Sequence, residues 1–407
     1  MKSQKLYIAM VGLPARGKST IARKLKEHLS KDTIKTKIFN NGDLRRKLTK
    51  KSTSHPEFYD SANTQGVALR EKIAHINCQN AKKYLNTNGN VAILDATNCS
   101  YQRRKKLIQE LTDYPILFIE CINDNKEILK ASIQRKTLMP EFKHLKQDAA
   151  IKGFEQRIDY YKQIYNPLKE EQNFVRLDSL NNRIIEEEIS NGIPYYDRIR
   201  DFLVSDAVKD LYLIRHGETY FNLENRIGGD SDLTINGISQ SRALAKYFTS
   251  KKIPIIFTSE KKRTIQTANP IRKLQENSLI IPLSEFDEID SGVCECMTYN
   301  EIRAKMPQVY LNRKKDKYNY LYPEGEGYVS MKKRINHGIK KALYLSGYPQ
   351  TIMIIGHQAV NRMILSHFLF RREEDVPYTY IPQDKFYHVV ATPNKKLFQL
   401  IKYDSQS

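Results

Sequence analysis

The sequence predicts an α/β protein with two domains, each built on a mostly parallel β-sheet covered by helices. Short apolar runs alternate with longer mixed segments along the chain, which is typical of β-α-β units. The length of 407 residues suits two domains. A charged segment at 181–204 separates two series of this kind, so we expect one domain at residues 1–207 and another at 208–407.

The individual elements follow from the apolar periodicity. In the first domain we expect strands at 6–11, 36–40, 90–95, 116–121 and 173–177, and a helix at 20–29. The spacing of Ile, Leu and Tyr in 181–204 suits a helix that is interrupted at residues 192–194. In the second domain we expect strands at 210–215, 255–258, 279–283, 351–355 and 387–392. The two series share no motif, so two different domains are expected.

Composition excludes several classes of protein. Hydrophobic residues make up 40% of the chain and no Pro/Gly/Ser-rich tract interrupts it, which excludes a disordered or fibrous protein. The apolar runs are far shorter than the roughly 18 residues that span a bilayer. The run at 6–11 is too short for a signal peptide. We therefore expect a cytoplasmic protein with no membrane partner.

The cysteines and the net charge bear on the ligands. Five cysteines with no C-x-x-C spacing favour reduced thiols over disulfides or a zinc site. The net charge of +21 favours polyanionic ligands, and both nucleic acids and phosphorylated metabolites meet that description. The motifs have to decide between these two classes.

A phosphate-binding loop is predicted between the first strand and the first helix. Residues 12–19, Gly-Leu-Pro-Ala-Arg-Gly-Lys-Ser, match G-x-x-x-x-G-K-[ST] in the strand-to-helix context that this motif requires. Such a loop surrounds phosphates with backbone N–H groups, so ATP with Mg²⁺ is the expected ligand; a plain Gly-rich turn is the alternative. Lys18 would meet the β- and γ-phosphates, and Ser19 would hold Mg²⁺. The expected ATP-binding residues are Gly12, Ala15, Arg16, Gly17, Lys18, Ser19 and Thr20.

A carboxylate at the end of a neighbouring strand completes the expected kinase site. Asp95 ends the run at 90–95 and would either orient Mg²⁺ or accept the proton of the acceptor hydroxyl; a helix cap is the alternative. Arginines at 45–46, 70 and 103–104 are either clamps for an anionic acceptor or ordinary surface charge.

Four stretches of this half of the chain, 12–19, 39–46, 95–104 and 157–161, together carry a specific resemblance. They resemble the kinase half of the bifunctional 6-phosphofructo-2-kinase/fructose-2,6-bisphosphatase family, whose acceptor is fructose 6-phosphate. Asn123 departs from that family, in which Cys stands near the nucleotide. The residues implied to contact the sugar phosphate are Arg46, Arg70, Thr97, Arg103, Lys136, Arg157 and Tyr161.

A second catalytic motif opens the second domain. Arg215-His216-Gly217-Glu218 ends an apolar run and resembles the signature of the histidine-phosphatase and phosphoglycerate-mutase superfamily. A histidine that attacks phosphorus needs cationic donors to hold the phosphoryl group. We expect Arg215, Arg263 and a positively charged His357 to be those donors, each at a strand-to-loop junction. A single histidine is more often structural, and only the combination of the two favours catalysis.

The acid-rich run at 286–295 offers either a proton donor for the leaving oxygen or solvated loop charges. Segments 226–233, 298–302, 316–318, 322–328 and 357–362 resemble the bisphosphatase half of the same family. The resemblance covers residues 5–395, and it implies that Glu288 is the general acid and that the protein is a homodimer. It also implies that the sugar and 6-phosphate of fructose 2,6-bisphosphate are held by Asn222, Gly228, Tyr299, Arg313, Lys317, Tyr328, Gln358 and Arg362.

Two other functions stay open on the sequence. A P-loop kinase joined to a phosphatase on a basic chain also fits polynucleotide end processing, with Tyr318, Tyr320 and Tyr322 as the platform for base stacking. The second is a protein that senses sugar phosphates with one silent domain, which the intact catalytic residues disfavour. We expect sugar phosphates and ATP as partners, not nucleic acid. Only five residues precede the first strand and seven follow Leu400, so switching through phosphorylated tails is not expected.

Overall fold

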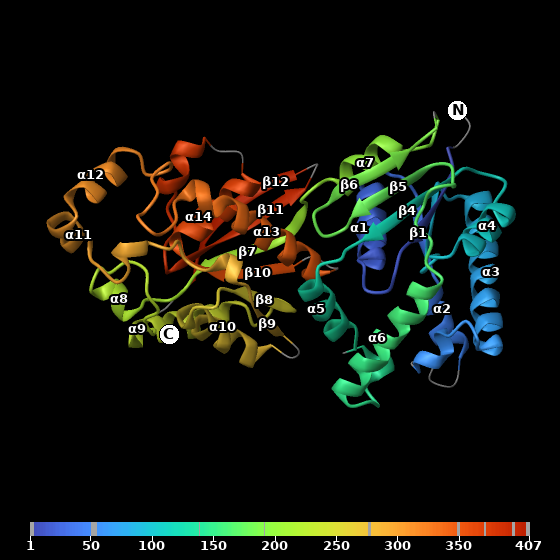
Figure 1. Ribbon diagram of the computed structural model, residues 1–407, viewed down its shortest axis with the longest axis horizontal. Coiled ribbons are helices and arrows are strands. Elements are labelled where there is room, and N and C mark those ends of the chain that lie inside the picture. The colour runs from blue at the N-terminus through green and yellow to red at the C-terminus, as the bar shows by residue number, and fades with distance from the viewer. Residues whose placement is uncertain are drawn as a thin grey trace. The chain divides into compact units, whose positions relative to one another are not determined.

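The computed structural model describes residues 4–49, 55–137, 139–190, 192–275, 278–347, 351–369, 372–392 and 395–403. The chain forms two compact units, Met1–Ser205 and Asp206–Ser407 (Figure 1). Each unit contains one six-stranded sheet. Over the ranges given, each helix is either too short or too polar to cross a lipid bilayer.

The sheet of the first unit has the strand order β2-β3-β1-β4-β5-β6. Its strands are β1 (Leu6–Val11), β2 (Thr36–Asn40), β3 (Val91–Asp95), β4 (Ile116–Ile122), β5 (Phe174–Asp178) and β6 (Arg183–Glu188). The first five are parallel, and β6 is antiparallel to β5. The predicted bounds of the five parallel strands are confirmed to within one residue at either end, because a buried parallel strand reads as a continuous apolar run.

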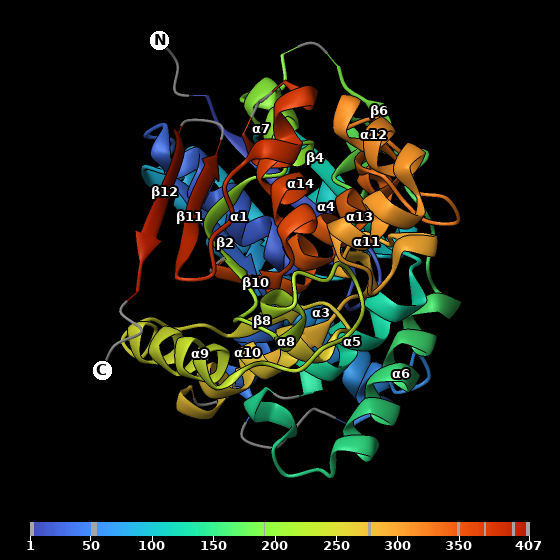
Figure 2. The ribbon, with the colours of Figure 1, turned by 90° about the vertical axis from the view of Figure 1, so that its left-hand side faces the viewer.

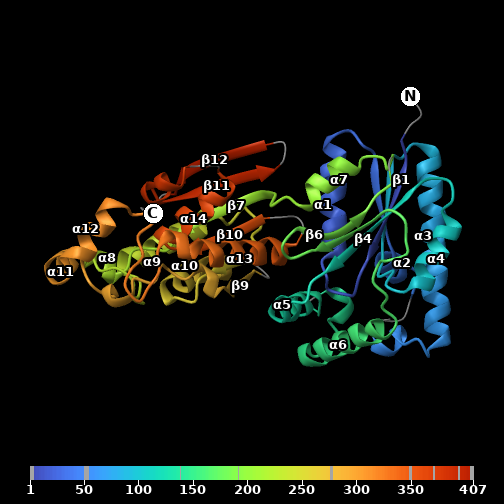
Figure 3. The same ribbon diagram turned by 45° about the horizontal axis from the view of Figure 1, so that its top comes forward.

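The central strand β1 is covered on both faces. Leu6, Ile8 and Met10 pack with α1 (Lys18–Lys31) and α7 (Tyr196–Leu203), whereas the alternate residues face α3 (Thr64–Thr87) and α4 (Tyr101–Glu110). Figure 3 shows these two pairs of helices on opposite sides of the sheet. The remaining helices are α2 (Asn41–Leu48), α5 (Lys126–Thr137) and α6 (Gln147–Gln163), with 3-10 turns at Pro56–Tyr59 and Pro140–Phe142. A strand buried on both faces gives the loop at its carboxyl end a rigid base.

The predicted helix over 181–204 is wrong in its first half. Asn182, with a φ of 49°, turns the chain so that β6 pairs with β5, and only α7 is helical. Arg176 on β5 contacts Glu186 on β6 at 2.6 Å. The charged residues of β6 would suit the solvated face of a helix as well as an exposed strand. Their preference for the helix is weak, and pairing with the edge strand β5 outweighs it.

The sheet of the second unit has the order β12-β11-β7-β10-β8-β9. Its strands are β7 (Val208–Arg215), β8 (Ile255–Thr258), β9 (Leu279–Pro282), β10 (Thr351–Gly356), β11 (Lys385–Thr392) and β12 (Lys395–Lys402). β7 to β10 are parallel, and β11 and β12 form an antiparallel hairpin at one edge (Figure 2). The sequence did not predict β12, which is largely exposed and therefore lacks a continuous apolar run.

The parallel strands of the second unit carry, at their carboxyl ends, several of the loops in which the phosphatase residues are predicted. Tyr212 and Ile214 of β7 pack with Leu244 of the helix α9 (Ile235–Tyr247) and with Phe248, which follows that helix, on one face. The helix α13 (Tyr328–Ser346) contacts β10, and the helix α14 (Gln358–Phe368) contacts β7. The helices are α8 (Tyr220–Leu223), α9 (Ile235–Tyr247), α10 (Lys262–Leu274), α11 (Tyr299–Lys305), α12 (Pro307–Lys315), α13 (Tyr328–Ser346) and α14 (Gln358–Phe368).

Candidate active sites

The phosphate loop joins β1 to α1 and depends on two glycines. Gly12 has a φ of 128°, and a Cβ there would lie 2.5 Å from the carbonyl oxygen of Cys121. Gly17 has a φ of 86° and caps the N-terminus of α1. Both positions need a residue without a side chain, because the backbone is left-handed at each and closely approached at Gly12. The loop therefore presents its backbone N–H groups at the positive end of α1. Of the other predicted ATP-binding residues, Ala15 and Arg16 lie in this loop, and Ser19 and Thr20 begin α1.

Lys18 lies buried at the base of the phosphate loop, with 8% of its surface exposed. Its Nζ donates a hydrogen bond of 2.6 Å to the carbonyl of Leu13. Burial lowers the pKa of Lys18 to about 8, and the charge of Asp95 acts in the opposite direction. Burial also lowers the pKa of Lys136 to about 8, and Asp95 opposes that shift too. The two lysines and Asp95, predicted from three separate segments, are thus within electrostatic range of one another.

The loop after β3 braces the phosphate loop. The N–H of Gly12 donates to the carbonyl of Thr97 at 3.0 Å, and the amide of Asn98 donates to the carbonyl of Met10 at 2.9 Å. Asp95, at the end of β3, is buried and accepts a hydrogen bond from the amide of Asn40. Its carboxylate therefore has a fixed position beside the phosphate loop.

Two of the predicted arginines, Arg70 and Arg157, lie against aromatic rings, and Arg46 lies close to Arg157. The guanidinium of Arg157 lies 3.9 Å from the centre of the Tyr59 ring, and burial lowers its pKa. Arg46 contacts Glu141 at 3.2 Å, as does the buried Arg45 at 2.6 Å. Arg70 and Tyr161 join the same cluster. Arg70 lies 5.6 Å from the Phe58 ring, and the ring of Tyr161 lies 5.9 Å from that of Tyr59.

The paired arginines at the start of α4 have different surroundings. Arg103 contacts Glu71 at 3.0 Å and is largely shielded. Arg104 is buried, contacts Glu171 at 2.5 Å, and donates to the carbonyl of Asn166 at 2.9 Å. A pair of adjacent arginines in a sequence does not tell which one faces the core, so the structural role of Arg104 was not predictable.

The predicted phosphatase residues of the second unit line one pocket of about 950 Å³, counted out to its open mouth. All of them except His357, which is fully buried, lie in its wall. These wall residues are Arg215, His216, Asn222, Gly228, Arg263, Glu288, Tyr299, Arg313, Lys317, Tyr328, Gln358 and Arg362. They come from β7 and from loops and helices more than 140 residues apart in the sequence.

His216 is held as a neutral imidazole in which Nδ1 is bound to the backbone and Nε2 is left for a reaction. Its Nδ1 lies 2.7 Å from the carbonyl of Gly217, so Nδ1 carries the hydrogen and donates it. Burial and then the charges of Arg263 and Arg215 hold the pKa of His216 well below its ordinary value. Its Nε2 is therefore unprotonated and chemically able to act as a nucleophile.

His357 differs from the expectation of a positively charged donor. The Nε of Arg263 donates to its Nδ1 at 3.2 Å, so its Nε2 carries the hydrogen and donates to the hydroxyl of Ser259 at 2.8 Å. Burial and the charge of Arg263 hold the pKa of His357 well below its ordinary value. The ring centres of His357 and His216 are 5.3 Å apart. A neutral His357 therefore fixes Arg263 beside His216.

Glu288 enters the pocket from the loop after the 3-10 turn Ser284–Phe286. Its Oε1 accepts a hydrogen bond of 3.0 Å from the N–H of Ile289. Its charge opposes the lowering of the pKa of Arg215 and Arg263 by burial, so the carboxylate lies within electrostatic range of both arginines.

One part of the pocket wall is cationic and aromatic. Arg313 lies 4.9 Å from the ring centre of Tyr299, and Arg362 donates to the hydroxyl of Tyr328 at 3.1 Å. Burial, then the charges of Arg362 and Arg313, lower the pKa of Lys317 to about 8. Three positive groups in addition to Arg215 and Arg263 suit a substrate with a second phosphate.

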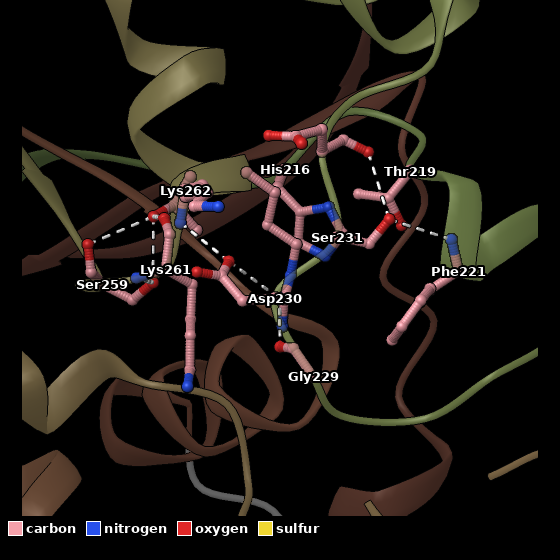
Figure 4. Close-up of polar contacts among 12 residues, drawn as sticks. His216, Thr219, Phe221, Gly229, Asp230, Ser231, Ser259, Lys261 and Lys262 are labelled. Atoms are coloured by element: carbon pink, nitrogen blue, oxygen red, sulfur yellow. Dashed lines mark hydrogen bonds and ion pairs between the residues drawn. The ribbon is translucent and has the colours of Figure 1, made fainter. Parts of the chain in front are cut away.

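Several supporting residues were missed on the sequence. Gln383 donates to the Asn222 side chain at 2.9 Å and to the carbonyl of His216 at 3.3 Å. Figure 4 shows the contacts that hold the neighbouring loops, among them the N–H of Phe221 on Ser231 at 3.2 Å and the N–H of Lys261 on Ser259 at 3.2 Å. No motif marks Gln383, because it acts on a segment more than 160 residues away in the sequence.

The matches to known proteins together cover nearly the whole chain. The family described as 6-phosphofructo-2-kinase matches residues 1–213, and the histidine phosphatase superfamily (branch 1) matches residues 211–403. A 6-phosphofructo-2-kinase/fructose-2,6-bisphosphatase from Aquarana catesbeiana is 35% identical over 396 residues, which cover 92% of this chain and 80% of the relative. The 6-phosphofructo-2-kinase/fructose-2,6-bisphosphatase 1 from Rattus norvegicus is 34% identical over 390 residues, covering 92% of this chain and 79% of the relative.

Proposed function

Because the chain belongs to the family of 6-phosphofructo-2-kinase/fructose-2,6-bisphosphatases, it makes and hydrolyses fructose 2,6-bisphosphate, and we propose that each of its two sites performs one reaction. Residues 1–207 are assigned to the kinase and residues 208–407 to the phosphatase. The geometry of His216 carries the proposal, since a buried neutral imidazole with Nδ1 bound to a carbonyl has only Nε2 available for attack on phosphorus.

In the kinase, the γ-phosphoryl group of ATP passes to the 2-hydroxyl of fructose 6-phosphate. Lys18 and the N–H groups of the phosphate loop hold the phosphates, and Asp95 takes up the hydroxyl proton. The hydroxyl of Ser19 and the carboxylate of Asp95 are oxygen donors of the kind that Mg²⁺ prefers, so they fit this ion. When bound, Mg²⁺ neutralises charge on the transferred phosphoryl group.

The acceptor would bind at the arginines gathered around Tyr59. A guanidinium binds a phosphate through two parallel hydrogen bonds, and the aromatic rings hold these guanidinium groups in place. We assign Arg46, Arg70, Arg157 and Tyr161 of this cluster to the 6-phosphate and sugar, together with Arg103 beside Glu71 and with Thr97 and Lys136 nearer the reacting hydroxyl.

In the phosphatase, Nε2 of His216 forms a bond to the 2-phosphorus while the bond from phosphorus to the sugar oxygen breaks. The electron pair of that bond stays on the sugar oxygen, which takes a proton from Glu288. Arg215 and Arg263 hold the phosphoryl oxygens during the transfer. Water then attacks the phosphohistidine, gives a proton to Glu288 and releases inorganic phosphate. The three cations Arg313, Lys317 and Arg362 in the pocket wall hold the 6-phosphate.

Labelling tests this assignment. The enzyme is mixed with substrate labelled in its 2-phosphate and quenched in alkali, in which phosphohistidine survives. Label on a peptide containing His216, slower labelling in Glu288→Gln and none in His216→Ala are the expected results. Label retained by His216→Ala, or found on His357 in the wild type, overturns the choice of nucleophile.

The structure weakens the alternative of polynucleotide end processing. Tyr318 and Tyr322, two of the three tyrosines that favoured base stacking, are each only 5% exposed and cannot stack on a base. We further propose that the protein is a cytoplasmic homodimer. Five free cysteines suit a reducing compartment, and light scattering tests the dimer.

A further inference from the structure

The loop that carries Glu288 has no regular secondary structure of its own. It runs from the 3-10 turn Ser284–Phe286 to the next turn at Gly292–Cys294. A carboxyl group that must meet a leaving oxygen within hydrogen-bond distance cannot be positioned by a loose loop. Something outside the loop therefore has to define where Glu288 lies.

Arg334, on the helix α13, contacts this loop along its length. Its Nη1 donates to the carbonyls of Glu285 and Asp287, both at 2.8 Å, and its Nη2 donates to the carbonyl of Glu288 at 3.3 Å. Three backbone carbonyls up to and including that of Glu288 are thus bound by one planar group. Planarity matters here, because it fixes the directions of the three hydrogen bonds relative to one another.

Glu326 completes the arrangement from the other side. Its two carboxylate oxygens accept hydrogen bonds from Nε of Arg334 at 2.8 Å and from Nη2 at 2.6 Å. All five N–H groups of Arg334 are therefore used. Glu326 also accepts from the N–H of Asp290 at 3.3 Å, and its own N–H donates to the carbonyl of Asp290 at 2.8 Å. The pair consequently holds the chain on both sides of Glu288.

Neither member of the pair lines the pocket, whose wall includes Glu288, Ile289 and Ser291 from this loop. Arg334 and Glu326 therefore act on the substrate indirectly, and the hydrogen bonds of Arg334 lead to the backbone of Glu288. We propose that Arg334, held by Glu326, is a positioning residue that places Glu288 for proton transfer. This inference rests on the role proposed above for Glu288.

A double-mutant cycle tests the proposal with the full-length enzyme. The measured quantity is the single-turnover rate of phosphohistidine formation from fructose 2,6-bisphosphate labelled in its 2-phosphate. Arg334→Lys keeps the charge but loses the planar group, and should slow this step by about 10- to 100-fold, the scale expected for a misplacement of about 1 Å. The substrate concentration that gives half-saturation should change little, because Arg313, Lys317 and Arg362 are unaltered. In a Glu288→Gln background the same change should alter the rate by less than about twofold, since the group that Arg334 positions is gone.

Controls separate the possible failures. Lys332 lies two residues before Arg334 on the same helix and forms an exposed ion pair with Glu373. Lys332→Met removes this ion pair and should leave the rate unchanged. Glu326→Gln should reproduce the effect of Arg334→Lys, and it replaces that variant if Arg334→Lys does not fold, as judged by loss of the calorimetric unfolding transition of the second unit. An equal slowing in both backgrounds, or no slowing in the presence of Glu288, overturns the proposal. If Glu288→Gln alone does not slow phosphohistidine formation, the assignment of the general acid fails instead.

Discussion

Replacing Lys18 by Met should stabilise the first unit while it abolishes kinase activity. Lys18 is buried, and burial lowers its pKa from 10.5 to about 8. At about 1.4 kcal/mol per pKa unit, this difference corresponds to roughly 3 kcal/mol that the folded unit loses by holding the charge. Met has a similar length and no charge, so the substitution removes that cost. The carbonyl of Leu13 loses its donor, which costs about 1 kcal/mol and leaves a net gain of about 2 kcal/mol.

The gain should depend on pH in a defined direction. Between pH 8 and 10.5 the unfolded chain holds more protons at Lys18 than the folded one, so the stability of the wild type rises with pH in this window. The full cost of the charge is present below about pH 8. The advantage of Lys18→Met should therefore be largest at pH 7 and shrink as the pH rises through this window.

Differential scanning calorimetry without nucleotide measures the effect. For a unit of 205 residues, 2 kcal/mol corresponds to an increase in Tm of about 4 to 8 °C in the transition that ATP shifts in the wild type. Lys26→Met, on the exposed side of α1, is the matched control and should change Tm little. Hydrolysis of fructose 2,6-bisphosphate should be retained. A Tm at or below that of the wild type at pH 7, or an equal gain at pH 7 and pH 10, would refute the reasoning.

Two further predictions concern the first unit. Arg103→Lys should raise the KM for fructose 6-phosphate much more than the KM for ATP, because an ammonium cannot bind a phosphate through two parallel bonds; an equal rise for both substrates contradicts the assignment of Arg103. Glu171→Ala should destabilise the unit by about 3 to 5 kcal/mol in urea unfolding, because it leaves the buried Arg104 without its carboxylate, whereas the exposed neighbour Glu170→Ala should have little effect. Equal unfolding midpoints for these two variants would contradict the role of this ion pair.

The local sequence was sufficient to predict the parallel strands and the candidate reactive groups. A strand buried on both faces needs a continuous apolar run, and the phosphate loop needs glycines and a lysine in fixed order, so both features can be read from adjacent residues. The Arg215-His216-Gly217 motif likewise predicted that the histidine proposed as the nucleophile directly follows a strand, and it follows β7. These features were predictable because their physical causes lie within a few residues of one another.

The tertiary structure decided what depends on distant partners. β6 forms a strand because the edge of β5 accepts it, although its own residues suit a helix, and β12 exists only as the partner of β11. The neutral state of His357 follows from its burial against Arg263, 94 residues away. The placement of Glu288 by Arg334 depends on carbonyl groups, which every residue carries and no sequence motif can mark. A sequence encodes such contacts only through the whole fold, because hydrogen bonds to the backbone are specified by position in space rather than by the identity of the residue that accepts them.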